Sequence, residues 1–207
     1  MMVQIETDPA WWAIVVSYSM VLGFTLGIGL RDDSWDTISS MVARAELTLH
    51  GFAMVTVGML GCQLYWLRVQ IERFTQATRT RTEPWLGDPI ASTCIALGAL
   101  GSTIGALGFG IVSKNLSEDD HIRFAGVAFC SVLLYLFGFL KLSLRKESKV
   151  HGSRAAMGWL ALAALSLVLL WQDQGYAWEY VLVTALHGGA LALTYPNAQP
   201  ILYQITL

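Results

Sequence analysis

The chain has 207 residues, of which 55% are hydrophobic and 14% are charged. Soluble domains carry about 25% charged residues, so this composition excludes an ordinary soluble domain. It predicts an all-α, polytopic membrane protein. The formal net charge is −2 and the sequence has no basic stripe, which argues against a nucleic-acid partner.

Six apolar segments follow one another along the chain, and we interpret each as a transmembrane helix. The predicted spans are residues 10–30, 46–67, 90–113, 122–144, 155–172 and 180–195. They form a single six-helix transmembrane domain over residues 1–207. Pro196 and Pro200 predict an irregular chain after the last span, because proline interrupts helical hydrogen bonding.

Small residues recur at helical spacing in two of the predicted spans. In the first, Ser19, Gly23 and Gly27 recur every four residues and predict a close approach by a neighbouring helix. In the third, the glycines follow an i, i+3, i+7, i+10 pattern at positions 98, 101, 105 and 108. This stripe predicts a helix-packing seam rather than a nucleotide-binding loop.

The distribution of basic residues predicts the orientation. Of the 13 lysines and arginines, four lie in the second loop and five in the fourth: Arg68, Arg73, Arg79 and Arg81, then Lys141, Arg145, Lys146, Lys149 and Arg154. Because cytoplasmic loops are enriched in lysine and arginine, both loops are predicted to be cytoplasmic. With six spans, the N and C termini are then cytoplasmic as well. The sequon at Asn115 falls in an outward-facing loop and is a candidate glycosylation site in a eukaryote.

The layout of the chain resembles the damage-regulated autophagy modulator (DRAM) family. Relatives of that family include proteins of GPI-anchor lipid remodelling and regulators of phosphatidylinositol 4-kinase. The resemblance is carried by SWDTISSM at 34–41, LGALGSTIGALGFGIVSKN at 97–115, EDDHIRFAGVAF at 118–129 and YLFGFLKLSLRK at 135–146. The chain departs from the family pattern in lacking paired prolines after the first segment and in having His187 at a position suited to another polar residue.

The resemblance implies a lipid-linked regulator or scaffold rather than an enzyme, without a bound cofactor. Its setting would be membrane lipid organisation, autophagy or phosphoinositide signalling, at the plasma membrane or in the endomembrane system. The implied partners are membrane lipids, together with proteins that bind the basic cytoplasmic loops.

A metal-dependent hydrolase is an alternative hypothesis. His50, His121 and His187 lie in the outer parts of three spans that run in the same direction, so they approach one membrane face. Three imidazoles with a carboxylate such as Asp36 or Asp120 suit a zinc ion that activates water. The competing interpretation, which we favour, is that each histidine bonds to its own helix.

A b-type haem protein is a second alternative. His50 and His187 would be the axial ligands, since HGFAM at 50–54 resembles the haem-bearing helix of haem-copper oxidases and the glycines after His187 leave room for a macrocycle. A third hypothesis needs no cofactor. Histidines beside the acidic outer loops would sense pH, because imidazole titrates near ~6.5.

Overall fold

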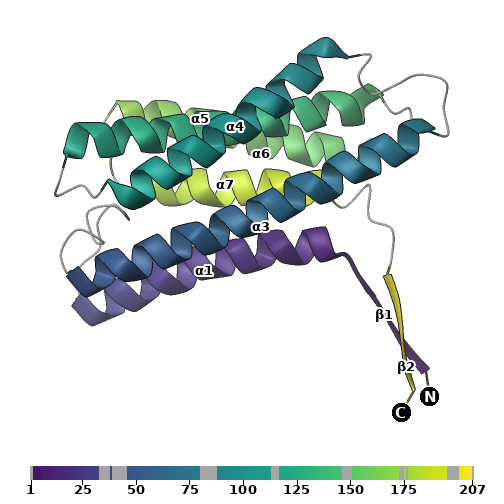
Figure 1. Ribbon diagram of the computed structural model, residues 1–207, viewed down its shortest axis with the longest axis horizontal. Helices are drawn as coiled ribbons and strands as arrows, with labels where there is room; N and C mark the ends of the chain where they lie inside the picture. Colours follow the sequence, from purple (N-terminus) through teal and green to yellow (C-terminus); the bar gives the residue numbers. More distant parts are fainter. Residues whose placement is uncertain are drawn as a thin grey trace.

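A computed structural model describes residues 2–32, 38, 46–79, 88–112, 117–145, 151–172, 175, 177–194 and 201–206. These residues include six helices with defined bounds and one pair of strands (Figure 1). The helices are α1 (Pro9–Asp32), α3 (Glu46–Arg79), α4 (Pro89–Ile111), α5 (Glu118–Arg145), α6 (His151–Trp171) and α7 (Ala177–Thr194). The strands β1 (Met2–Thr7) and β2 (Ile201–Thr206) pair antiparallel, with Met2 opposite Thr206. No strand was expected from the sequence.

Five helices contain a segment that is long and apolar enough to cross a membrane. These segments are Pro9–Leu30, Gly51–Arg73, Pro89–Ile111, Glu118–Leu144 and Ser153–Trp171. The expectation of a helical protein with six helices is therefore confirmed, and five of these helices have the length and composition of membrane spans. The sixth helix, α7, is outside this group of five, yet nine of its 18 residues are buried. It is the central helix of the bundle.

Helix α3 is longer than the span predicted at 46–67. It continues to Arg79 and has 34 residues, which at ~1.5 Å per residue makes it about 51 Å long. Arg68 and Glu72 are one turn apart and form an ion pair of 2.9 Å, which supports the helix beyond the apolar part. Its last turns therefore extend past a hydrocarbon layer of ~30 Å.

Consecutive helices run in opposite directions, with α1 and α3 on one side of α7 and α4, α5 and α6 on the other (Figure 1). The starts of α1 and α4 lie at the same end of the bundle as the ends of α3, α5 and α7. We call this the Asp8 end, because Arg73 bonds to Asp8 there and Lys141 bonds to Asp88. The opposite end, where α5 begins with His121 in its first turns, is the His121 end.

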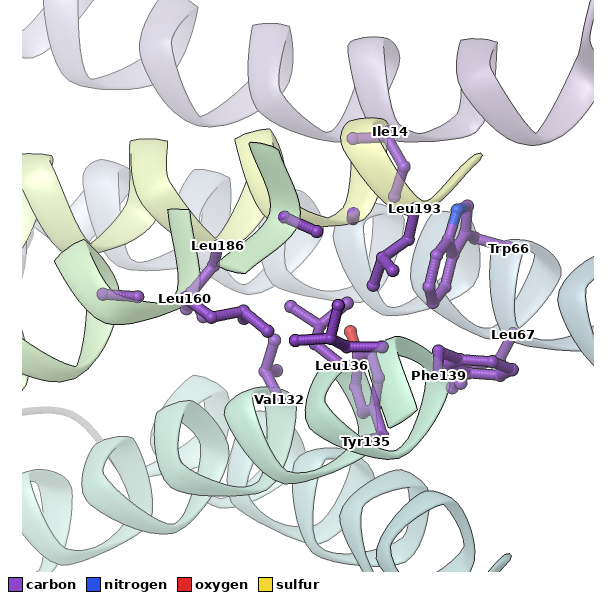
Figure 2. Packing of buried hydrophobic residues seen from close by; sticks show 14 of the residues in the cluster. Ile14, Trp66, Leu67, Val132, Tyr135, Leu136, Phe139, Leu160, Leu186 and Leu193 are labelled. Carbon is purple, nitrogen blue, oxygen red and sulfur yellow. The ribbon is translucent and has the colours of Figure 1, made fainter. Parts of the chain in front are cut away.

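The main hydrophobic core joins all six helices around α7. Trp66, Leu136, Phe139 and Leu182 have almost no exposed surface there, and Figure 2 shows aromatic side chains from α3 and α5 meeting Leu193 of α7. A smaller cluster lies towards the His121 end: Val21, Ile28, Ile38, Phe52 and Val183. Burial of this apolar surface holds the helix pairs together within the bundle.

The glycine stripe of α4 packs against α5, as its spacing predicted. A Cβ atom added at Gly98 would lie 2.6 Å from the Ser131 carbonyl oxygen and the Tyr135 backbone nitrogen. At Gly105, an added Cβ would collide with the backbone of Ala128. The backbones of α4 and α5 therefore approach so closely that only glycine fits at these two positions.

The corresponding prediction for α1 is wrong within this chain. Gly23 and Gly27 are exposed, and no described atom lies within 4 Å of a Cβ built at either position. Helix α1 instead buries Ala13, Ser17 and Val21 against its neighbours. Small-residue spacing indicates a face that permits close approach, but it does not show which side of α1 meets the other helices.

Candidate functional site

His187 lies in α7 and joins it to α1. Its exposed fraction is 8%, its Nδ1 is 2.8 Å from the Val183 carbonyl oxygen and its Nε2 is 3.1 Å from the Ser17 hydroxyl. Tyr18 packs its ring 5.2 Å from the imidazole and shares a hydrogen bond of 3.0 Å with Thr184. Both ring nitrogens of His187 are thus engaged within the helix bundle.

His121 has a different setting at the end of α4. Its Nδ1 lies 2.7 Å from the carbonyl oxygen of Val112, the C-cap residue of α4, and its exposed fraction is 4%. Its ring meets Phe109 edge-on at 6.2 Å. The contact ties the first turns of α5 to the last carbonyls of α4, which otherwise lack a helical partner.

Asp120 belongs to the N-terminal cap of α5. The Ser117 hydroxyl donates to its carboxylate at 2.9 Å and accepts from its backbone N–H at 3.3 Å, so Ser117 acts as the N-cap of α5. Arg123 adds an exposed ion pair of 3.3 Å. The carboxylate proposed for a zinc site therefore bonds to its own helix start.

The remaining candidate residues are only partly described. The backbone of His50 belongs to the first turns of α3, whereas its side chain, like Asp36 and Asn115, lies outside the described residues. Among the side chains that are described, no three of His, Cys, Asp and Glu gather as metal ligands would. For the haem hypothesis, His187 would have to release Ser17 or Val183 before it could bind iron.

A partly open cavity of about 60 Å³ lies beside His187 and is lined by residues of α1, α3, α4, α5 and α7. Its wall is mainly apolar, but five polar side chains reach it: Thr56, Gln63, Ser102, Tyr135 and His187. No Asp, Glu, Lys or Arg is among its described lining residues. We call it the polar cavity. Figure 2 shows the Tyr135 hydroxyl pointing into the middle of the bundle rather than towards its surface.

A second cavity of about 60 Å³ adjoins the first on the side of the His121 end. The two share Thr56, Met59, Phe109, Phe129 and Val183 in their walls. We call it the apolar cavity, because Thr25, Thr56 and Glu179 are the polar residues in an otherwise hydrophobic lining. The Glu179 carboxylate accepts a hydrogen bond of 2.8 Å from the backbone of Ile38.

Thr56 stands at the boundary of the two cavities. Its exposed fraction is 4%, and its buried hydroxyl has no hydrogen-bond partner among the described residues. Helical threonines usually donate to a preceding carbonyl, as Thr25 and Thr194 do here. A buried hydroxyl without a partner costs about 1–3 kcal/mol, so Thr56 marks a place that favours a polar guest.

Sequence reasoning identified His187 but missed its neighbours in the polar cavity. Gln63, Ser102 and Tyr135 come from three different helices, and each is a single polar residue within an apolar run. A polar side chain at membrane depth is costly and usually indicates function. This signal could have identified each of the three residues from the sequence. Only the packing of the helices shows that these side chains meet.

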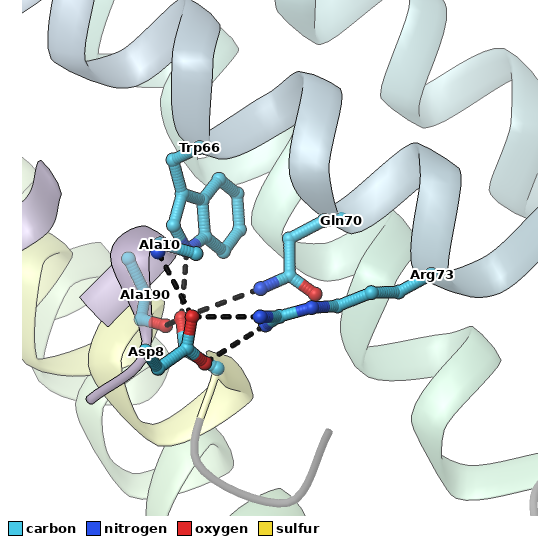
Figure 3. A network of polar contacts seen from close by, with 7 residues as sticks. Asp8, Ala10, Trp66, Gln70, Arg73 and Ala190 are labelled. Atoms are coloured by element: carbon cyan, nitrogen blue, oxygen red, sulfur yellow. Dashed lines mark hydrogen bonds and ion pairs between the residues drawn. The ribbon is translucent and has the colours of Figure 1, made fainter. Parts of the chain in front are cut away.

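A polar network at the Asp8 end fixes three helices relative to one another (Figure 3). Asp8 caps α1 through the Ala10 N–H at 2.9 Å and receives both terminal nitrogens of Arg73 at 2.9 and 2.6 Å. Close by, the Thr194 hydroxyl accepts from Trp66 at 2.6 Å and from Gln70 at 3.4 Å. These bonds join the start of α1 and the end of α7 to α3, and they have a structural role.

Comparisons with protein-family models, curated proteins and solved structures found no match to this chain.

Proposed function

We propose that this chain is a six-span membrane regulator or scaffold that works by holding part of a lipid molecule between its helices. In this proposal α7 crosses the membrane with the other five helices, and the Asp8 end, with both termini, faces the cytoplasm. The resemblance to the DRAM family implies the same lipid-linked role, at the plasma membrane or in the endomembrane system. No chemical step is assigned to the protein.

The two adjoining cavities are the observation that carries the proposal. A mostly hydrophobic lining with a few placed polar groups is typical of a ligand site, and two cavities of about 60 Å³ each fit a segment of a lipid rather than the whole molecule. The hydrogen bonds of His187 and Asp120 within the protein favour such a binding role over the zinc and haem hypotheses, since these side chains already have partners.

The basic residues at the Asp8 end supply a second contact with lipid. Arg68 is largely exposed, with 76% of its side chain accessible, and α3 carries it towards the end of the apolar segment. Basic residues near an anionic membrane surface contribute about 1 kcal/mol each. Anionic headgroups, or a protein partner, are therefore the proposed contacts of this end.

The test is whether purified protein retains lipid in its cavities. Ala106 lines the polar cavity, so Ala106→Leu fills part of it, while Ala96→Leu places the same side chain on an exposed position of α4. Native mass spectrometry of detergent-purified protein should show bound lipid on the wild type and on Ala96→Leu, and several-fold less on Ala106→Leu. Equal retention by all three proteins would contradict the proposal.

The same sample tests the cofactor hypotheses. A haem protein would show a Soret band, and a zinc hydrolase would contain stoichiometric zinc. We expect neither in the absorbance spectrum and the elemental analysis.

A further inference from the structure

We infer that the polar cavity binds a small cluster of water molecules, which join α3 to α4 and α5 through hydrogen bonds. This inference goes beyond the proposed function, because it concerns the polar wall of the cavity and does not depend on a lipid. The ligand is a small neutral molecule that both donates and accepts hydrogen bonds.

The first argument is the size of the space. The polar cavity is partly open and has a volume of about 60 Å³. A water molecule takes up about 30 Å³ in the liquid, so the cavity accommodates a few water molecules. Its volume restricts any guest to a few heavy atoms.

The second argument is that polar side chains around the cavity lack partners within the described part of the protein. The hydroxyl of Thr56 is buried and has no hydrogen bond there. Gln63 and Tyr135 also line the cavity, and neither side chain forms a hydrogen bond with another described residue. A buried polar group without a partner is costly, and ordered internal water commonly supplies the missing partner.

The third argument is the mixture of donors and acceptors in the wall. The Ser102 hydroxyl donates to the Ala99 carbonyl at 3.0 Å, so its oxygen offers acceptor positions to the cavity. The Gln63 amide offers donors and a carbonyl acceptor, and the hydroxyls of Thr56 and Tyr135 can each donate and accept. Water matches both kinds of group.

An ion matches this wall less well than water does. A cation would use only the acceptors, and an anion would use only the donors. The described lining residues also include no Asp, Glu, Lys or Arg, so an ion would lack a counter-charge in a buried site.

The fourth argument is depth. Ser102 is the fourteenth of the 23 residues of α4, and Tyr135 is the eighteenth of the 28 residues of α5. The polar cavity thus lies near the middle of these helices, where the surrounding bilayer is hydrocarbon. Hydrocarbon cannot form hydrogen bonds with the protein, so water held inside the bundle satisfies these side chains.

The position of the cavity gives the water a structural role. Described side-chain hydrogen bonds join α3 to α1 and to α7 at the Asp8 end. In the polar cavity, Thr56 and Gln63 come from α3, whereas Ser102 and Tyr135 come from α4 and α5. Water bonded to both sets ties α3 to the seam between α4 and α5 in the middle of the bundle.

The first experiment detects the water through its oxygen atom. The full chain in detergent micelles is transferred to water that carries a heavy oxygen isotope and is irradiated briefly with X-rays. Irradiated water yields hydroxyl radicals, which oxidise the side chains beside it, and mass spectrometry of the peptides locates the heavy oxygen. The measurement uses the wild-type chain, so it does not depend on how any variant folds.

Tyr135 and Phe139 form a matched pair for this experiment. They lie one turn apart on α5 and are 3% and 1% exposed, but Tyr135 lines the polar cavity and Phe139 does not. With each normalised to its labelling in the unfolded chain, we expect severalfold more heavy oxygen on Tyr135. Equal labelling of the two residues overturns the inference.

A variant that fills the cavity tests where the reactive water lies. Ala106 is in the wall of the polar cavity, whereas Ala96 is at an exposed position of α4. Ala106→Leu should reduce the labelling of Tyr135 severalfold, and Ala96→Leu should leave it unchanged. If Ala106→Leu does not reduce the labelling, the water lies outside the cavity and the inference is wrong.

The second experiment asks whether the Thr56 hydroxyl has a partner. Thr56→Val keeps the shape of the side chain and removes the hydroxyl. If water bonds to this hydroxyl, the ratio of folded to unfolded protein should fall about fivefold, the equivalent of one hydrogen bond. If the hydroxyl has no partner, its removal stabilises the protein and the ratio rises.

We expect the fall, measured against Thr93→Val as the control. Thr93 is at an exposed position of α4, so this variant makes the same change of side chain away from the cavity. Thr56→Val that is as stable as Thr93→Val, or more stable, contradicts the inference. Lipid retention enters neither experiment, so the proposed function is tested separately.

Discussion

Thr194 illustrates how a single hydroxyl fixes helix positions in this bundle. It donates to the Ala190 carbonyl at 2.7 Å and accepts from the Trp66 indole and the Gln70 amide. A hydroxyl offers one donor and two acceptor positions, so Thr194 uses its full hydrogen-bonding capacity. All three side chains are buried, which makes each of these bonds hard to replace with water.

We predict that Thr194→Val lowers the free energy of unfolding by about 1–3 kcal/mol, because it leaves the buried donors of Trp66 and Gln70 without an acceptor. Thr194→Ser keeps the oxygen and should lose much less. Unfolding of purified protein in mixed micelles, titrated with a denaturing detergent, measures the difference. If valine and serine at this position were equally stable, the hydrogen bonds would not stabilise the end of α7.

The Asp8–Arg73 pair makes a second prediction at the residue scale. Its side chains are 7% and 17% exposed, whereas those of the Arg68–Glu72 pair are 53% or more exposed. A double-mutant cycle with Asp8→Asn and Arg73→Gln should give a coupling energy of about 1–3 kcal/mol. The same cycle on the exposed Arg68 and Glu72 should give a much smaller coupling energy, and comparable values for both pairs would rule out burial as the cause.

At the scale of helices, the seam between α4 and α5 is the closest packing in the described part of the chain. Gly98 and Gly105 face backbone atoms of α5, which cannot rotate away from an added methyl group. The close approach of α4 to α5 therefore depends on glycine, which has no side chain, at these two positions. Helix α1 has glycines at similar spacing that face no described neighbour, so the same sequence pattern has two different structural outcomes.

These two helices supply a matched pair of substitutions. Gly105→Ala should destabilise the protein by about 1–3 kcal/mol, since α4 must move away from Ala128. Gly23→Ala in α1 has open space around it and should be neutral or stabilising by up to about 1 kcal/mol, because alanine favours helix. The same unfolding titration compares them, and a loss of stability at Gly23 would instead indicate a close contact on that face of α1.

At the scale of the molecule, the position of α7 decides the topology. It packs against α1, α5 and α6 and has nine of its 18 residues buried, as expected for a helix that faces protein rather than lipid. Because consecutive helices alternate in direction (Figure 1), a membrane-crossing α7 brings both chain ends to one side. The pairing of β1 with β2 also brings the two chain ends together on one side.

Epitope tags at the two termini test this arrangement. We expect both tags to be protected in intact cells and to become accessible together when the membrane is permeabilised, since the basic loops predict a cytoplasmic Asp8 end. Labelling on opposite sides of the membrane would mean that α7 does not cross. Labelling of both tags in intact cells would reverse the orientation but keep six spans.

The sequence by itself determined the class of protein, the six helices and the α4 seam, because hydrophobic length and small-residue spacing act within one helix and need no knowledge of its neighbours. It also singled out His187, as a candidate zinc or haem ligand or as a histidine bonded to its own helix. It did not predict the extension of α3 to Arg79 or the pairing of the terminal strands.

Only the tertiary structure decided which polar groups meet. Thr56, Gln63, Ser102 and Tyr135 come from α3, α4 and α5, and they gather around one cavity with His187 of α7. His121 and Asp120 were candidate zinc ligands because they were predicted near one membrane face. His121 instead bonds to the end of the preceding helix, α4, and Asp120 bonds to the start of its own helix, α5. The physical reason is that the rotation of each helix about its axis depends on packing against all its neighbours, and no single segment encodes it.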